Sequence, residues 1–366
     1  MFQGIVIVHP SLRLPAAVLA LTAMLATGTA VQALPFGPSG PKSVELAPDN
    51  TADAITHFTP TAVQSLKGVH RIAISQLQVE YVTRSQGLTR KERNQVTVQY
   101  GLKPPSDAGL QAATDKLYDH LVAQLQAAGF EVAPRAEIEA APSWRKLASV
   151  GKPSGGEFKS ESGSGRLFVA GAGPYYFYPG DLHLGTAAIG WGFSQAHITE
   201  QALGTELNAA VVTVRLVVGI RETDRHSQMF ALLRTASSFM GDPRINVEAP
   251  ASGLFVMTPG KGHGMTNAAG RAAFTVKDDL LFHEDLMSAT LKDTGGAAST
   301  AGNIASSALF AGAILANMAG GGIGMKLYKS YKFDAEPPEA DYLAAVDRNL
   351  AGVEDAMVAQ LKAAAQ

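Results

Sequence analysis

A long amphipathic helix between two strand-like segments constrains the fold more than any other part of this sequence. The first segment, VHRIAISQLQVEYV, begins at Val69, and the second, FEVAP, begins at Phe130. The intervening SDAGLQAATDKLYDHLVAQLQAAG repeats apolar residues at three-, four- and seven-residue spacing, which is typical of a helix with one buried face. A strand, a covering helix and a second strand predict a parallel βαβ pair with a right-handed crossover.

The ends of this helix and its buried face can be assigned from individual residues. Ser106 or Asp107 follows two prolines and can accept a hydrogen bond from the first free N–H groups. Gly129 follows the last apolar residue, at a position where a left-handed backbone often ends a helix. The apolar stripe that should face the sheet consists of Leu110, Leu117, Leu121, Leu125 and Ala128.

The strand from Val69 changes its alternation along its length. It alternates through Ile74 and then shifts by one residue from Leu77 onward, which predicts a bulge or strand end near Ser75. A second alternating segment, residues 96–100, is expected to pair back against residues 77–81. The basic sequence RSQGLTRKER between them should then be a hairpin tip, which is either solvated or in contact with anionic lipid.

Further strands and helices follow this unit. Residues 136–150 predict a helix interrupted by Pro142, and the Gly/Ser-rich residues 151–165 predict a mobile loop. The nearly continuous β-branched run 209–220 is typical of a strand buried on both faces, so we place it at the centre of the sheet. Short strands at 254–257 and 272–276 should extend the sheet in antiparallel fashion.

The C-terminal residues predict one more strand, at 328–333, and a last helix. This helix carries a four-three seam that needs a partner, formed by Leu343, Val346, Leu350, Val353 and Met357. The predicted fold class is α/β to α+β: a mixed sheet with a βαβ core, antiparallel additions, an Ala/Gly-rich helix and a C-terminal amphipathic helix. The predicted organisation is a signal peptide (1–33), a linker (34–65), an α/β domain (66–290), an Ala/Gly-rich apolar segment (291–326) and a strand with the C-terminal helix (327–366).

The N-terminus has the pattern of an export signal. Arg13 is the only Lys, Arg, Asp or Glu before Lys42, residues 14–26 form an apolar run, and Val31-Gln32-Ala33 fits the small-x-Ala pattern of a signal-peptidase site. Cleavage would leave a mature chain that begins near Leu34. The alternative is an uncleaved anchor, although about 13 apolar residues are few for a membrane span of roughly 20. We expect a location in the periplasm or cell envelope.

Adjacent aromatic residues form a candidate binding site. They lie between Pro174 and Pro179, and no regular element turns four consecutive side chains inward. Some of them should therefore be exposed and bind an apolar or glycan ligand. The alternative is a packed loop corner whose tyrosine hydroxyls reach water. The candidate ligand-binding residues are Tyr175, Tyr176, Phe177, Tyr178 and Trp191.

The stretch from Thr294 to Met325 has no charged residue and is rich in alanine and glycine. Small residues recur there every four positions, a spacing that lets helices approach closely. Its length permits a transmembrane helix, whereas its polar residues and the run Gly320–Gly322 favour a buried or self-associating helix. The candidate membrane or association residues are Ala308, Gly312, Ala316 and Gly320.

The sequence carries no recognisable catalytic motif. The chain has no cysteine, which excludes disulfides, thiolate catalysis and cysteine metal sites. The histidines form no zinc motif, and His283-Glu284-Asp285 is typical of a solvated helix face. Ser164 in SGSGR lacks the spacing of a nucleophile elbow, and Lys261 in TPGKGHGMT lacks that of a phosphate-binding loop. We expect no metal and no cofactor, and the net charge of −2 argues against a nucleic-acid partner.

The order of strand, helix and FEV strand, followed by a helix that ends in ELNAAVVTVRLVVG, resembles exported bacterial proteins of the curli-secretion lipoprotein type. It is also similar to the N-terminal domain of the Tol-system translocation protein. The resemblance is one of pattern over residues 69–138 and 198–220, and it implies a periplasmic α/β unit that serves envelope assembly. Curli-type proteins carry a lipid-modified cysteine after the signal, which this chain lacks, so the resemblance transfers neither acylation nor any functional residue.

Three functions are compatible with this sequence. The first is an exported, non-enzymatic envelope protein with a binding or assembly role, whose partner is a second copy or another envelope protein and which contacts the membrane. The second is a periplasmic carrier of an apolar or glycan ligand. The third is a hydrolase whose acidic residues are scattered along the chain.

Overall fold

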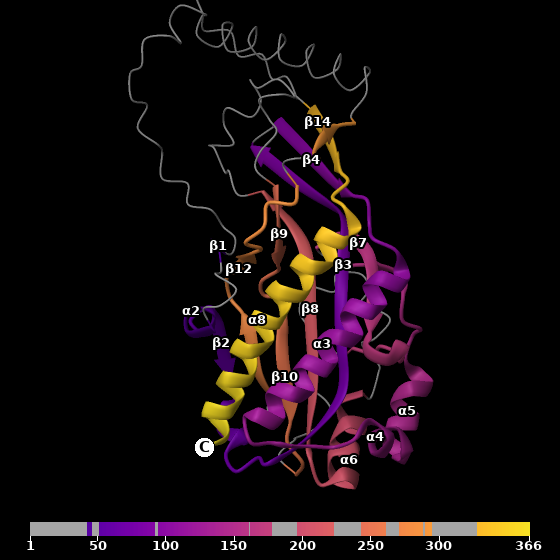
Figure 1. The fold of residues 1–366 in the computed structure, drawn as a ribbon, viewed down its shortest axis with the longest axis vertical. Helices are drawn as coiled ribbons and strands as arrows, with labels where there is room; N and C mark the ends of the chain where they lie inside the picture. Colours follow the sequence, from indigo (N-terminus) through magenta and orange to yellow (C-terminus); the bar gives the residue numbers. More distant parts are fainter. Residues whose placement is uncertain are drawn as a thin grey trace, which may run out of the picture. The chain divides into compact units, whose positions relative to one another are not determined.

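The protein has a mixed α/β fold, as the sequence predicts. The computed structural model describes residues 42–45, 51–91, 94–160, 162–177, 196–222, 243–260, 271–287, 290–294 and 328–366. Within these ranges the strands form one 14-stranded sheet that contains both parallel and antiparallel pairs (Figure 1). The predicted signal peptide and the Ala/Gly-rich stretch lie outside the described residues.

Two long parallel strands form the centre of the sheet: β3 (Arg71–Lys91) and β8 (Ala210–Glu222). The sheet order is β1-β12-β9-β8-β3-β4-β14-β13. The other strands on this path are β1 (Ser43–Glu45), β12 (Asp279–Leu281), β9 (Pro243–Val247), β4 (Asn94–Leu102), β14 (Tyr328–Ala335) and β13 (Lys292–Asp293). The strands off this path are β2 (Phe58–Thr61), β5 (Glu131–Val132), β6 (Gly156–Lys159), β7 (Ser164–Val169), β10 (Gly253–Met257) and β11 (Arg271–Val276).

The predicted βαβ unit is confirmed. Helix α3 (Asp107–Ala127) begins after Ser106, whose hydroxyl accepts a hydrogen bond from the N–H of Gly109 (3.1 Å). The chain leaves the helix through Gly129, which has a φ of 98° that most other residues would find strained. It then enters β5, which lies parallel to the start of β3.

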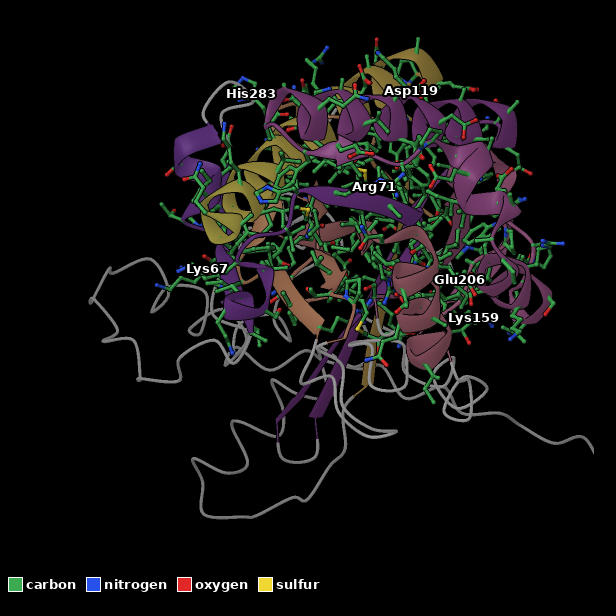
Figure 2. All side chains as sticks on the ribbon, turned by 90° about the horizontal axis from the view of Figure 1, so that it is seen from below. Lys67, Arg71, Asp119, Lys159, Glu206 and His283 are labelled. Atoms are coloured by element: carbon green, nitrogen blue, oxygen red, sulfur yellow. The ribbon has the colours of Figure 1, made fainter. Side chains whose placement is uncertain are left out.

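One face of the sheet is apolar because α3 and the C-terminal helix α8 (Glu339–Ala365) cover it. These two helices lie side by side on one side of the sheet, and α6 (Ala196–Leu207) lies on the other side, as Figure 2 shows from below. The predicted seams of both helices enter this core, where each fully buried leucine contributes about 1.5–3 kcal/mol. The seam residues that are buried are Leu110, Leu117, Leu121, Leu125, Val346, Leu350, Val353 and Met357.

Helix α8 also buries one acid in this apolar core. Glu354 is fully buried, and neither of its carboxylate oxygens has a hydrogen-bond partner among the described residues. Burial raises the pKa of Glu354 well above its usual range, and the nearby Asp355 and Asp347 raise it further. The side chain is therefore held in the neutral, protonated form.

Strand β3 shows the predicted bulge and one pairing that differs from expectation. Its register with β8 shifts between Ile74 and Gln76, which places the bulge at Ser75. The expected pairing of residues 96–100 with residues 77–81 is wrong, because β4 pairs with residues 84–91. Residues 78–81 already have β8 on one edge and β7 on the other, so no edge is left for β4. Most of the basic sequence that was expected to form a hairpin tip, residues 84–91, is therefore paired strand.

Two segments that were expected to lack regular structure belong to the sheet. The predicted mobile loop 151–165 contains β6 and most of the turn to β7, which pairs with β3. The described part of the predicted linker 34–65 contains β1, helix α2 (Thr51–Ile55), β2 and the start of a 3₁₀ turn (Val63–Leu66). Local composition is a poor guide here because β1 and β2 pair with distant strands, and β6 pairs with β7, which itself pairs with the distant β3.

The other predicted elements that lie within the described residues are confirmed. The helix around Pro142 divides into α4 (Arg135–Ala140) and α5 (Pro142–Val150). Strands β10 and β11 are antiparallel additions, and β14 follows the predicted boundaries closely. Residues 210–220 of β8 are buried along both faces, except that Gly219 has no side chain to bury.

Candidate functional site

The face of β3 and β8 opposite to α3 and α8 carries polar side chains that are nevertheless buried. After the bulge, every second residue of β3 turns to this face, and the parallel register sets Gln76 beside Thr213 and Gln78 beside Arg215. Each side chain is at most 5% exposed. We call this set the polar stripe: Ser75, Gln76, Gln78, Glu80, Thr213 and Arg215.

A buried ion pair lies in the middle of the polar stripe. The Arg215 guanidinium donates to Glu80 Oε2 at 2.9 Å, and the hydroxyl of Ser160 donates to Glu80 Oε1 at 2.5 Å. The Arg215 guanidinium also lies 5.2 Å from the centre of the Phe177 ring, within range of a cation–π interaction. Burying two charges is costly unless other contacts compensate, and here Glu80 is bonded to both Arg215 and Ser160 while Arg215 also lies over the Phe177 ring.

A second acid, Glu200 of α6, lies at the end of the polar stripe that is formed by Ser75 and Thr213. Its Oε1 accepts hydrogen bonds from the hydroxyls of Tyr176 (2.6 Å), Ser75 (2.9 Å) and Thr213 (3.1 Å). The bulge directs Ser75 to this carboxylate. Burial raises the pKa of Glu200, although the three hydroxyls and the charge of Arg271 act in the opposite direction. Burial and the neighbouring Glu200 also raise the pKa of Tyr176, so the phenol remains a donor.

A third acid, Glu248, follows β9, and its side chain lies against Gly219 of β8 on the same face. Burial raises the pKa of its carboxyl to about 7, and the charges of Asp279 and Glu80 raise it further, whereas Ser162 and Arg221 lower it. Asp279 accepts a hydrogen bond from the N–H of Ala249 (2.9 Å) and pairs with Arg221 at 3.1 Å.

The aromatic candidates Tyr175, Tyr176 and Phe177 are buried, so an exposed platform is wrong for these three residues. The packed-corner alternative describes them, because Phe158 of β6 contacts the Tyr175 ring (5.9 Å) and the Phe177 ring (5.6 Å). The segment nevertheless contacts the polar stripe, because the carbonyl of Tyr176 accepts a hydrogen bond from Gln76 and the Phe177 ring lies beside Arg215. Tyr178 and Trp191 lie outside the described residues, and ligand binding by the set stays a prediction.

The other residues considered from the sequence are not brought into this site. Ala308, Gly312, Ala316, Gly320 and Lys261 lie outside the described part of the chain. His283 is in a loop rather than on the expected helix face, 3.3 Å from Glu45, and its neighbour Glu284 pairs with Arg348 of α8 at 2.6 Å. Ser164 starts β7, where its carbonyl accepts a hydrogen bond from Thr83.

The polar stripe was missed in the sequence although a signal was present. Residues 76–81, QLQVEY, alternate polar and apolar residues as a strand with one polar face does. Thr213 and Arg215 interrupt the apolar run of β8 at the same two-residue spacing. Alternation of this kind normally indicates a solvated face, so the sequence alone would not have predicted that this face is buried.

Chemically, the described groups form a fixed polar interior. The serine and tyrosine hydroxyls donate to carboxylates, and the carboxylates are occupied by these bonds and by arginine. In the described part of the chain, no three histidine, aspartate or glutamate side chains come together as a metal site would require. None of the described helices has the length and apolarity needed to cross a membrane.

Comparison with protein-family models, with curated proteins and with solved structures found no significant match for this chain.

Proposed function

We propose that this protein is an exported, non-enzymatic component of the cell envelope with a binding or assembly role. One observation carries the non-enzymatic part: the buried acids Glu80 and Glu200 are bonded to the hydroxyls and the arginine around them. A catalytic site instead directs a nucleophile and its base at one common point where a substrate atom can lie. A rigid polar interior suits a scaffold that presents surfaces to partners.

The export part of the proposal rests on the sequence. Arg13, the apolar residues 14–26 and the Val31-Gln32-Ala33 site have the order of charged, apolar and small residues that a signal peptidase recognises. The absence of cysteine is compatible with an oxidising compartment, because no thiol is available for mispairing.

N-terminal sequencing of the protein from fractionated cells tests the export. We expect a mature chain that begins near Leu34 in the periplasmic or envelope fraction. Ala33→Asp should block cleavage and leave a longer chain, whereas the matched control Gln32→Ala should be processed normally because the middle position is not selected. An intact Met1 on protein from the cytosol would refute the proposal.

A second candidate function, a periplasmic carrier, is favoured by unmet hydrogen-bonding groups on the polar face. Gln78 Oε1 and both polar atoms of the Asn246 side chain are buried and have no hydrogen-bond partner among the described residues. Buried polar atoms of this kind usually meet a water or a ligand. The aromatic contact of Phe177 with Arg215 lies on the same face.

Release from cells separates the two candidates. A carrier should leave the cell on osmotic shock and should yield a bound small molecule when the purified protein is denatured and examined by mass spectrometry. An assembly component should remain with the membranes until detergent is added. Recovery in the shock fluid without any bound molecule would contradict both candidates.

A further inference from the structure

Asn246 of β9 carries a buried amide whose hydrogen-bonding atoms are all unmet. Its side chain is fully buried, and neither Oδ1 nor Nδ2 has a hydrogen-bond partner among the described residues. The antiparallel register sets Asn246 directly opposite Gly219, which shares a face of β8 with Arg215 of the polar stripe. A buried amide without partners is costly, so in native proteins such a group usually meets a water or a ligand.

Glu248 lies where the side chain opposite Asn246 would be. A Cβ on Gly219 would collide with the Glu248 carboxyl group, so this carboxyl occupies the position of the missing side chain. Residues that face each other across antiparallel strands have Cβ atoms about 4.5–5.5 Å apart. The carboxyl of Glu248 and the amide of Asn246 are therefore neighbours, yet the amide makes no bond to it. A single polar group between them would reach both.

Two arginines form the rim of this site. Arg221 and Arg244 face each other directly across β8 and β9, an arrangement in which like charges repel. The Nε of Arg221 lies 3.1 Å from Oδ2 of Asp279, and the Arg221 side chain is 30% exposed, so this rim faces solvent. Arg244 donates to the carbonyl of Phe282 (2.7 Å), whereas its Nε is buried without a partner among the described residues.

The unmet atoms determine the chemistry of a ligand. They comprise two donors, Arg244 Nε and Asn246 Nδ2, and one acceptor, Asn246 Oδ1. An anion only accepts and a cation only donates, so either would leave part of this set unmet. The charges of the rim are also balanced, because Arg221 pairs with Asp279 and Arg244 lies 3.9 Å from Glu45. An alcohol hydroxyl is neutral, accepts two hydrogen bonds and donates one, which matches the set.

We propose that this end of the polar face binds a neutral, hydroxyl-bearing compound such as a sugar, through a hydroxyl group inserted between Asn246 and Glu248. The rest of the molecule lies on the solvent side, against Arg221. This inference rests on the carrier candidate and names the chemistry of its ligand. It selects a glycan over an apolar ligand, because the atoms that lack partners are polar.

Titration of the purified protein with glycerol and with glucose tests the ligand class. Glycerol is a sufficient minimal probe because the site takes a single hydroxyl group. We expect saturable binding that shifts the side-chain amide signal of Asn246 in NMR spectra. Acetate, which only accepts, and ammonium, which only donates, should not displace either compound. Displacement by one of these ions would overturn the proposal. The absence of saturable binding would also overturn it, because water alone would then meet Asn246.

The variant Asn246→Leu removes the amide and keeps a side chain of similar size. It should weaken glucose binding by at least about tenfold, since more than one hydrogen bond is lost. The urea midpoint of the free protein should stay the same or rise, because no unmet amide remains. The matched control Gln78→Leu removes another buried amide from the same face, on β3, and should leave glucose binding unchanged.

Equal glucose affinity in Asn246→Leu and the wild type would overturn the proposal, and the titration of the wild-type amide signal decides if the variant does not fold. This test is separate from that of the carrier function. Release by osmotic shock with a bound molecule that lacks hydroxyl groups would support the carrier and refute the hydroxyl site. Glucose binding at Asn246 in a protein that remains with the membranes would support the site and refute the carrier.

Discussion

Replacement of Glu354 by glutamine should stabilise the protein at neutral pH. The side chain is fully buried between α8 and the apolar face of the sheet, and its oxygens lack hydrogen-bond partners among the described residues. Burial raises the pKa of Tyr81 of β3, and an ionised Glu354 would raise it further. The acid therefore lies in the core near Tyr81.

The magnitude follows from the two protonation states. The unfolded chain ionises Glu354 at its ordinary pKa of 4.5, whereas the folded protein keeps it neutral to a pKa well above that value. This stabilisation is fully present below pH 4.5 and is lost as pH rises toward the folded-state pKa. The free energy of unfolding should fall by about 1.4 kcal/mol per pH unit, which over the 2.5 units from pH 4.5 to pH 7 amounts to at most roughly 3 to 4 kcal/mol.

Urea unfolding at pH 5, 6 and 7, followed by the fluorescence of the buried Trp144, measures this effect. Glu354→Gln has nearly the same shape and no charge, so it should match the wild type at low pH and exceed its stability at pH 7. The control is Asp355→Asn, on the same helix as Glu354. Asp355 is partly exposed and pairs with His120 of α3 at 2.9 Å, so its loss should change the free energy of unfolding by about 1 kcal/mol or less. Equal pH slopes for wild type and Glu354→Gln would refute the reasoning.

Two further predictions concern the two faces of the sheet. Leu121→Asp places an unpaired carboxylate at a fully buried position of α3. It should lower the free energy of unfolding in urea by on the order of 3 kcal/mol or more. An unchanged urea midpoint would show that this face of the helix is not packed. Arg215→Met leaves Glu80 buried without its ion-pair partner and should lower the free energy of unfolding by about 3–5 kcal/mol. The double variant Glu80→Leu with Arg215→Met should recover most of this stability. Equal losses of stability in the single and double variants would contradict a paired role.

The apolar side of the fold was predictable from the sequence because its signals are local. The capping serine Ser106, the seam of α3 and the final Gly129 all act within a few residues of one another. The same holds for α8 and for the bulge at Ser75, which a phase change along a single strand reveals. Periodicity predicts which residues face the core, and the seam residues of α3 and α8 that it predicted are mostly buried.

The polar side was not predictable in this way. The burial of Glu80 and Arg215 depends on elements that cover the second face of the sheet, and no periodicity in β3 or β8 reports them. The turn at Ser160 looked mobile because glycine and serine dominate it, yet its hydroxyl bonds to Glu80, a carboxylate that is distant in sequence. The bonds of Glu200 to Tyr176, Ser75 and Thr213 likewise join three separate segments.

The strand pairings of this sheet also determine when the protein can fold during synthesis. Strand β1 pairs through Ser43 with Asp279, and β4 pairs through Gln95 with Tyr328. Each pairing closes a very large loop, so these two pairings cannot form until most of the chain has left the ribosome. Topologies rich in such non-local pairings fold slowly and expose strand edges for longer.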